Sequence, residues 1–176
     1  METTRDLLLR VAEGNREAFT ELYRTEKDKV YAFALSLLKN AHDAEDVLHD
    51  CFVTVWMKAD TYSPSGKPMA WIMTVARNLC YDKLRSRGKL ADLPDEEWDG
   101  LFSTDGGLPT EDRLVLRTCL RQLTKEENEI LFLHAVAGMK HHEIARLLYK
   151  PLATVLSKYN RTLAKLRQML SEEEQT

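Results

Sequence analysis

Side chains suited to binding nucleic acid gather near the carboxyl end of the chain. They are Lys150, Thr154, Ser157, Lys158 and Arg161. Lysine and arginine neutralise phosphates, and hydroxyl and guanidinium groups can hydrogen-bond base edges in a DNA major groove. Spacings of three and four residues place the last four on one side of a helix. This pattern predicts a DNA-reading helix; a solvated charged helix on an ordinary bundle is the alternative.

Two helices around a tight turn would position these side chains. The stretch KHHEIARLLYKPLATVLSKYNRTLAKLRQML spans residues 140–170 and repeats apolar residues at helical spacing on both sides of Pro151. Those apolar positions are Ile144, Leu147, Leu148, Val155, Tyr159, Leu163, Leu166 and Leu170. Pro151 cannot continue the first helix and disfavours helical backbone at Lys150. The stretch therefore predicts a helix-turn-helix with a basic second helix.

A second basic segment lies in the middle of the chain. Residues 60–68, DTYSPSGKP, are rich in Pro and Gly and predict a loop. The helix expected over residues 69–87 has a polar face with Arg77, Asn78, Tyr81, Lys83, Arg85 and Arg87. Aromatic faces stack unpaired bases at about 1–3 kcal/mol each while cations follow the backbone, so the segment suits single-stranded nucleic acid. Trp71 is more simply explained as a core residue, because it adjoins Ile72 on the apolar side.

Charge is segregated along the chain, although the formal net charge is only -3. Residues 61–90 hold 6 Lys or Arg and 1 acid, and residues 113–170 hold 11 and 4. Residues 91–112, between them, hold 8 acids and no Lys or Arg. Two basic blocks around an acidic connector predict two separate contacts with a polyanion.

The sequence predicts an all-α fold of two small helical domains joined by a flexible linker. Thr3 or Thr4 can cap a first helix, a second helix follows over residues 16–39, and Asp43 is expected to cap a third. Thr124 and Glu127 predict a capping box for a helix that ends near Gly138. Residues 88–109 lack periodicity and read as the linker.

The helix expected from Asp43 to Trp56 has an acidic outer face with Glu45, Asp46 and Asp50. Acids at a helix amino terminus interact favourably with the helix dipole, which accounts for Asp43 and Glu45. The dipole explains Asp46 and Asp50 less well, because they lie further along. The inward positions of the same helix are Ala44, Val47, Leu48, Cys51, Phe52, Val55 and Trp56.

Neither an enzyme nor a metal or cofactor protein is indicated. His142-Glu143 begins an HExxH zinc motif, but Arg146 replaces its second histidine. His134, His141 and His142 are instead expected on helix surfaces. The sequence also lacks a Gly-rich phosphate loop and a nucleophile with a spaced base. We expect no catalytic residue, no metal ligand and no cofactor.

The cysteines and the hydropathy pattern predict a cytoplasmic protein. Cys51, Cys80 and Cys119 are unpaired by spacing, which favours buried thiols in a reducing compartment. The longest nearly apolar run, residues 30–38, is well short of the roughly 20 residues of a membrane span. The amino terminus lacks the pattern of a signal peptide. Membrane insertion is therefore not expected.

Three stretches in this order resemble the sigma-70 family of bacterial RNA polymerase sigma factors, specifically the extracytoplasmic-function (ECF) group. DAEDVLHDCFVTVW, residues 43–56, is similar to the family's polymerase-clamp helix. GKPMAWIMTVARNLCYDKLRSR, residues 66–87, resembles its promoter-melting segment. LTKEENEILFLHAVAGMKHHEIARLL, residues 123–148, resembles the start of its DNA-reading domain. The resemblance implies a factor that binds polymerase core, melts the minus-ten element and reads the minus-thirty-five element.

The resemblance also implies domain boundaries and site residues. Residues 1–88 would form the region 2-like domain, 89–109 the acidic linker, 110–170 the region 4-like domain and 171–176 an acidic tail. Asp43, Glu45, Asp46, Asp50 and Phe52 would meet the polymerase. Tyr62, Ser63, Lys67, Trp71, Asn78, Tyr81, Asp82 and Arg85 would bind the minus-ten element. Lys150, Thr154, Ser157, Lys158 and Arg161 would bind the minus-thirty-five element.

The implied partners are RNA polymerase core, promoter DNA and an anti-sigma factor. Several residues depart from the family pattern: Tyr149 and Ala153 stand where Gly is usual, Leu156 where Lys or Arg is usual, and Lys158 where Arg is usual. A left-handed turn position is costly for Tyr, so a different turn is expected there. Two other functions stay open, a helix-turn-helix regulator that does not bind polymerase and a protein-binding adaptor without DNA contact.

Overall fold

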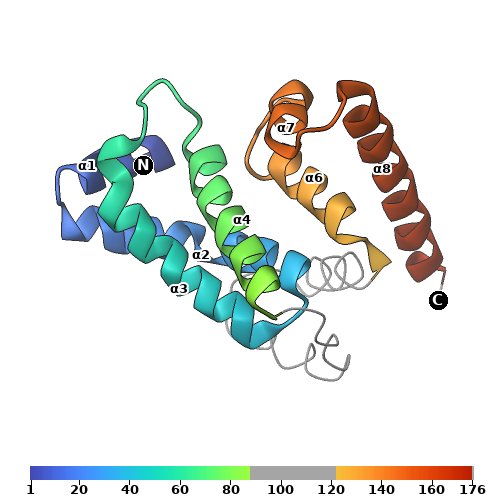
Figure 1. The fold of residues 1–176 in the computed structure, drawn as a ribbon, viewed down its shortest axis with the longest axis horizontal. Helices are drawn as coiled ribbons and strands as arrows, with labels where there is room; N and C mark the ends of the chain where they lie inside the picture. The colour runs from blue at the N-terminus through green and yellow to red at the C-terminus, as the bar shows by residue number, and fades with distance from the viewer. Residues whose placement is uncertain (88–121, 176) are drawn as a thin grey trace.

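A computed structural model describes residues 1–87 and 122–175, and every α-helix or 3-10 helix named below lies within them. The amino-terminal half contains α1 (Thr4–Ala12), α2 (Arg16–Leu38), α3 (Ala41–Lys58), the 3-10 turn η1 (Ala59–Thr61) and α4 (Pro68–Arg87). The carboxyl-terminal half contains α6 (Lys125–Ala135), α7 (His141–Leu148) and α8 (Leu152–Glu174). Within these ranges the regular structure is entirely helical, which confirms the predicted all-α class. Figure 1 shows the two halves side by side.

The helices of the first half begin and end where the local sequence supplies caps. The Thr3 side chain accepts a hydrogen bond from the backbone N–H of Asp6, and the Asp6 carboxylate caps Thr3 in return, as a capping box. Asn15 caps α2 in a similar way through Ala18. Lys39 ends α2 in a left-handed conformation at φ 50°. The chain therefore turns sharply between α2 and α3, which pack side by side (Figure 1).

The start of α3 corrects the sequence prediction. The helix begins at Ala41, and its cap is Asn40, whose side-chain oxygen accepts from the Asp43 N–H at 3.0 Å. Asp43 therefore lies inside the first turn. The physical reason is that asparagine caps a helix as well as aspartate does, so Asn40 starts α3 instead of separating the helices. Trp56, predicted to point inward, is 37% exposed.

A capping box also starts the second half, as predicted. Thr124 and Glu127 cap each other at the head of α6. Gly138, at φ 70°, follows the helix in a left-handed conformation that glycine adopts without strain. The basic helix α8 runs to Glu174, so it continues beyond residue 170. The predicted linker and Cys119 lie outside the described residues.

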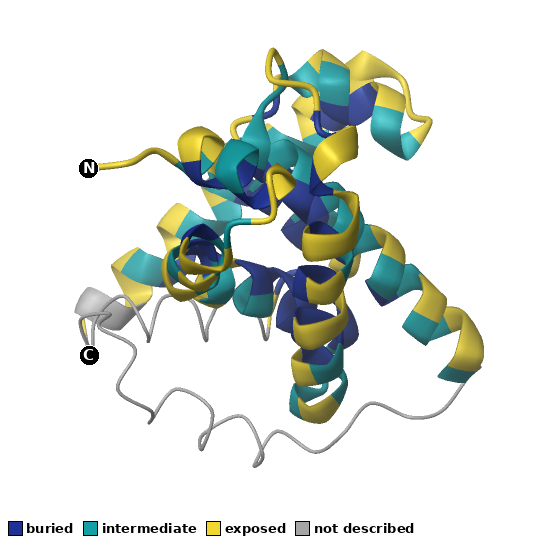
Figure 2. Cartoon of the chain, turned by 90° about the vertical axis from the view of Figure 1, so that its left-hand side faces the viewer, coloured by how far each residue is buried: buried dark blue, intermediate teal, exposed yellow. Residues whose placement is uncertain are grey.

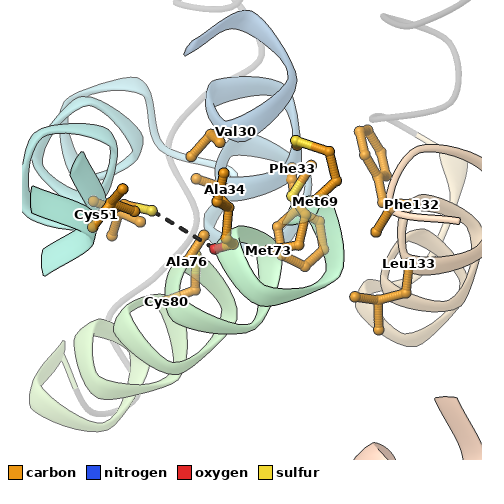
Figure 3. Packing of buried hydrophobic residues seen from close by; sticks show 14 of the residues in the cluster. Val30, Phe33, Ala34, Cys51, Met69, Met73, Ala76, Cys80, Phe132 and Leu133 are labelled. Atoms are coloured by element: carbon orange, nitrogen blue, oxygen red, sulfur yellow. Dashed lines mark hydrogen bonds between the residues drawn. The ribbon is translucent and has the colours of Figure 1, made fainter. Parts of the chain in front are cut away.

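The two helical domains pack against each other, and one continuous core cluster spans both. Phe33 of α2 lies 5.7 Å from Phe132 of α6, measured between ring centroids. Figure 3 shows Phe132 and Leu133 facing the cluster that α2 and α4 form. The buried Asn128 amide also donates to the Ser36 carbonyl at 3.4 Å. Buried residues follow the surfaces where helices meet (Figure 2), so α6 closes the α2–α4 core.

Two histidines predicted on helix surfaces belong to a ring cluster inside the second half. His134 of α6 and His141 of α7 lie 4.1 Å apart, and the Tyr159 ring of α8 contacts both, at 4.8 and 4.7 Å. The His134 ring also hydrogen-bonds the Met139 carbonyl through Nδ1 at 2.8 Å. The surface prediction was incomplete for this pair, because both rings are half-buried where α6, α7 and α8 meet. His142 is exposed, as predicted.

Candidate nucleic-acid and polymerase interfaces

The helix-turn-helix predicted after residue 140 is formed by α7 and α8. Val155 and Thr162, each at most 1% exposed, anchor α8 against the rest of the unit. The opposite face leaves Thr154, Ser157 and Arg161 exposed, as the spacing predicts. This face of α8 is therefore accessible to a duplex.

Two cations of the predicted DNA-binding set are held by an acid within the same unit. Lys150 Nζ lies 2.7 Å from Glu126, and Lys158 forms a second ion pair with that carboxylate. The hydrogen bonds from Lys150 and Lys158 lower the pKa of Glu126 below its ordinary value. Lys158 is consequently half-buried rather than fully outward. Glu126 thus fixes both lysines at the edge of the exposed face.

The turn between α7 and α8 uses the left-handed conformation in spite of its tyrosine. Tyr149 has φ 53° and caps α7, so the expectation of a differently built turn was wrong. Its side chain is 96% exposed. Pro151 fixes the chain on the other side of the turn, and α8 begins at the next residue. Tyr149 therefore adopts a strained left-handed conformation at a position where its side chain is fully exposed.

The loop predicted to bind the minus-ten element packs its aromatic residue inward. Tyr62 is 5% exposed, its hydroxyl donates to the Gly66 carbonyl at 2.7 Å, and its ring lies 5.8 Å from Trp71. Gly66 lacks room for a side chain, because a Cβ would lie 3.1 Å from the Ser63 carbonyl oxygen. Ser63 and the two residues after it are exposed. Tyr62 therefore shapes the loop, and its tip offers the accessible groups.

Three side chains on or near α4 reach across to the second half. Lys67 donates to the Glu143 carboxylate at 2.8 Å and to the Gly138 carbonyl at 2.9 Å. Arg77 forms a short ion pair with Glu129, whose side chain is 4% exposed. The Tyr81 hydroxyl donates to Glu129 at 2.9 Å, and burial together with that carboxylate raises the pKa of Tyr81 to about 12. In this arrangement the predicted minus-ten residues Lys67 and Tyr81 have intramolecular partners.

The remaining predicted minus-ten residues differ in exposure. Asn78 is exposed on α4. Asp82 and Arg85 form an exposed ion pair one helical turn further along. Trp71 is half-buried against Tyr62, in keeping with its interpretation as a core residue. The structure thus gathers these residues along α4 and the adjacent loop.

The acidic helix α3 divides its predicted residues between internal ion pairs and exposed positions. Asp43 pairs with Arg87 at 2.8 Å, and Asp46 with Lys83 at 3.0 Å, which lowers the pKa of Asp46. Glu45 and Asp50 are exposed. The prediction of a polymerase contact through the Phe52 side chain conflicts with its burial: Phe52 is 2% exposed in the core.

Sequence reasoning missed two exposed apolar residues on the same helix. Val53 is 57% and Met57 71% exposed. With Asp46 and Asp50 they occupy one side of α3 at helical spacing, acids first and apolar groups after them. A break in the inward apolar stripe, with Val53 lying outside it, was the signal that could have found them.

A helix-turn-helix joined to a helical module with a basic, aromatic loop and helix defines a DNA-binding class of protein. The family model "Sigma-70 region 2" matches residues 22–90, and "Sigma-70, region 4" matches residues 113–166. Together they span most of the chain. The chain belongs to the sigma-70 family and is an ECF sigma factor, a protein that binds RNA polymerase and directs promoter-specific initiation.

Curated relatives match along nearly the whole chain. The ECF sigma factor SigW of Bacillus subtilis is 26% identical over 176 residues, covering 92% of this chain and 94% of its own. SigK of Mycobacterium sp. (strain KMS) is 28% identical over 166 residues, covering 89% and 85%.

Solved structures share the fold. CnrH in complex with the cytosolic domain of CnrY matches with a TM-score of 0.62 and 23% identity, covering 97% of this chain and 99% of that one. RpoE from Bartonella quintana, in complex with the anti-sigma factor NepR, matches with a TM-score of 0.61 and 24% identity, covering 87% and 96%.

Proposed function

We propose that this sigma factor uses three separate surfaces, of which the outer face of α3 binds the polymerase core. The observation that supports this assignment is the side of α3 that carries Asp46, Asp50, Val53 and Met57. The exposed Asp50, the half-buried Asp46 and two large exposed apolar groups suit a protein partner with a basic and apolar surface. Phe52 supports this surface from behind, through its ring contact with Tyr23 at 4.9 Å.

The minus-ten element would be held by the 62–67 loop and α4. Ser63 at the loop tip and Asn78 on α4 are exposed and can hydrogen-bond an extruded base. Arg85 supplies positive charge for the backbone of the separated strand. Tyr62 and Trp71 would support the loop from beneath, because their rings pack together. Domain boundaries at residues 88, 109 and 170 remain part of this proposal.

The minus-thirty-five element would be read by α8. Thr154, Ser157 and Arg161 face outward on one side, and the Glu126 pairs hold Lys150 and Lys158 at its edge. Hydroxyls can bond base edges and phosphates, and Arg161 can bond guanine or phosphate. The chain's own residues thus bind and position DNA, whereas the polymerase would supply the active site. We propose no cofactor and no catalytic residue for this chain.

Promoter binding requires the two halves to separate. Lys67 and Tyr81 cannot contact the minus-ten strand while Glu143 and Glu129 hold them. We propose that polymerase binding favours the separated arrangement, because core enzyme would then bind it more tightly than the packed one.

An anti-sigma factor is a further proposed partner, since two proteins of this fold were solved in complexes with CnrY and NepR. Transcription takes place where the polymerase is, which supports a cytoplasmic location. None of the helices in the described ranges is long and apolar enough to cross a membrane.

Asp50→Arg tests the polymerase surface. We expect the variant to lose co-purification with core polymerase, because Asp50 is exposed at the centre of the α3 face. Glu13→Arg is the matched control, since Glu13 is an exposed acid at the end of α1. Asp50 is preferable to Asp46, whose replacement would also break the Lys83 pair. Full retention of core binding by Asp50→Arg would remove the α3 assignment.

A further inference from the structure

Three of the large exposed apolar residues in the described structure lie together at the helix-turn-helix. Tyr149 is 96%, Leu152 44% and Leu156 39% exposed. Leu152 and Leu156 are four residues apart on α8, so they are neighbours on one side of the helix. Tyr149 and Leu152 also line a shallow hollow between α7 and α8.

Leu156 lies beside the face proposed to enter the major groove. Ser157, the next residue along the chain, is exposed about 100° further round the helix. The inward side is marked by Val155, which is 0% exposed. Leu156 lies about 100° round the helix from the buried Val155, so it borders the outward side, where a side chain without polar atoms can make only apolar contacts.

The surroundings of Leu156 favour nucleic acid over an apolar protein surface. Arg146, Lys150 and Arg161 are exposed around the turn and along α8. An apolar group within a cationic border suits a polyanion that displays an apolar group of its own. In the major groove, the apolar group that bases display is the 5-methyl of thymine.

We propose that Leu156 is a specificity-determining residue that contacts a thymine 5-methyl group in the minus-thirty-five element. Leucine at this position exchanges hydrogen-bond recognition of guanine for apolar recognition of an A·T pair. The inference rests on the proposed role of α8. The inference goes beyond that role by naming the base, thymine, that one position of the helix would select.

Replacing thymine with deoxyuridine tests the contact, because it removes the methyl group and leaves the base pairing unchanged. The promoter would first be identified by run-off transcription with polymerase core. Each thymine of its minus-thirty-five element is then replaced in turn, and the affinity of the holoenzyme is measured. One methyl group buried against Leu156 is worth about fourfold in affinity. We expect that loss at one position for the natural chain and no methyl effect there for Leu156→Ala.

Leu152→Ala is the matched control, because it removes an equally exposed leucine from the same helix. It should keep the methyl effect. Loss of the effect in Leu152→Ala but not in Leu156→Ala would overturn the assignment, as would a natural holoenzyme that is insensitive to every replacement. Scrambling the whole element distinguishes the two levels of failure. If scrambling matters and methyl removal does not, only this inference fails; if scrambling has no effect, the proposed role of α8 fails as well.

Discussion

Glu129→Ala should weaken the packing between the two halves. The Glu129 side chain is 4% exposed and accepts hydrogen bonds from Arg77 and Tyr81 of the other half. Removing one partner of a buried ion pair costs about 3–5 kcal/mol, because the other charge is left without compensation. At about 3 kcal/mol, the equilibrium between packed and separated halves would shift by roughly 100-fold.

Small-angle X-ray scattering of the free chain measures this shift directly. A compact chain of 176 residues has a radius of gyration of about 16 Å, and separated halves have a larger one. We expect the radius to rise in Glu129→Ala, with a melting temperature lower by about 6–12 °C where the halves unfold together. Glu126→Ala is the control for size, because it removes an acid paired only within the second half. A Glu129→Ala protein with unchanged radius and unchanged melting temperature would show that the Glu129 pairs do not hold the two halves together.

Three further predictions follow from single positions. Tyr149→Gly should raise the free energy of unfolding by up to about 1 kcal/mol in thermal melts, because it relieves a left-handed tyrosine whose side chain is 96% exposed; a lower melting temperature would contradict this. Arg161→Ala should lower the slope of log affinity against log salt for promoter complexes by about 1, and an unchanged slope would mean that α8 does not face DNA. Burial, with the nearby His134, lowers the pKa of His141, so the unfolded chain binds more protons just below the ordinary histidine pKa of about 6.5. The free energy of unfolding should therefore fall between pH 7.5 and about 5.5, and less so in His141→Phe; an equal fall in both proteins would exclude His141 as the cause.

Local signals in the sequence predicted much of the fold. The cap at Thr3, the capping box at Thr124 and the helix-turn-helix around Pro151 depend on residues a few positions apart, which a linear pattern records. The same reasoning failed at Asn40, because a residue that favours turns also caps helices. It failed at Tyr149 as well, where the chain keeps the left-handed conformation with a side chain that is 96% exposed.

Contacts between distant residues could not be predicted in this way. Lys67 meets Glu143 across 76 positions, and Arg77 meets Glu129 across 52. Periodicity shows that a helix has an inward face but not which helix covers it, so the shared core of α2, α4 and α6 was missed. A usable hint was present, since residues 113–170 hold only four acids. All four form ion pairs with Lys or Arg. Two of these acids, Glu129 and Glu143, have their partners in the first half.

The site residues were predicted by position along the chain rather than by accessibility. Tyr62 and Phe52 lie in the loop and the helix proposed as interfaces, but their side chains are buried in the core. The structure then added exposed apolar residues to the proposed interfaces, namely Val53, Met57 and Leu156. Sequence patterns tend to hide such residues, since an apolar side chain is first assigned to the interior.

Run-off transcription with purified polymerase core on a library of genomic fragments shows whether this chain directs initiation at specific promoters. We expect core enzyme alone to start at random and the addition of this chain to produce discrete start sites. These sites should share two upstream elements at a fixed separation. Identical start sites with and without the chain would mean that it does not direct promoter selection.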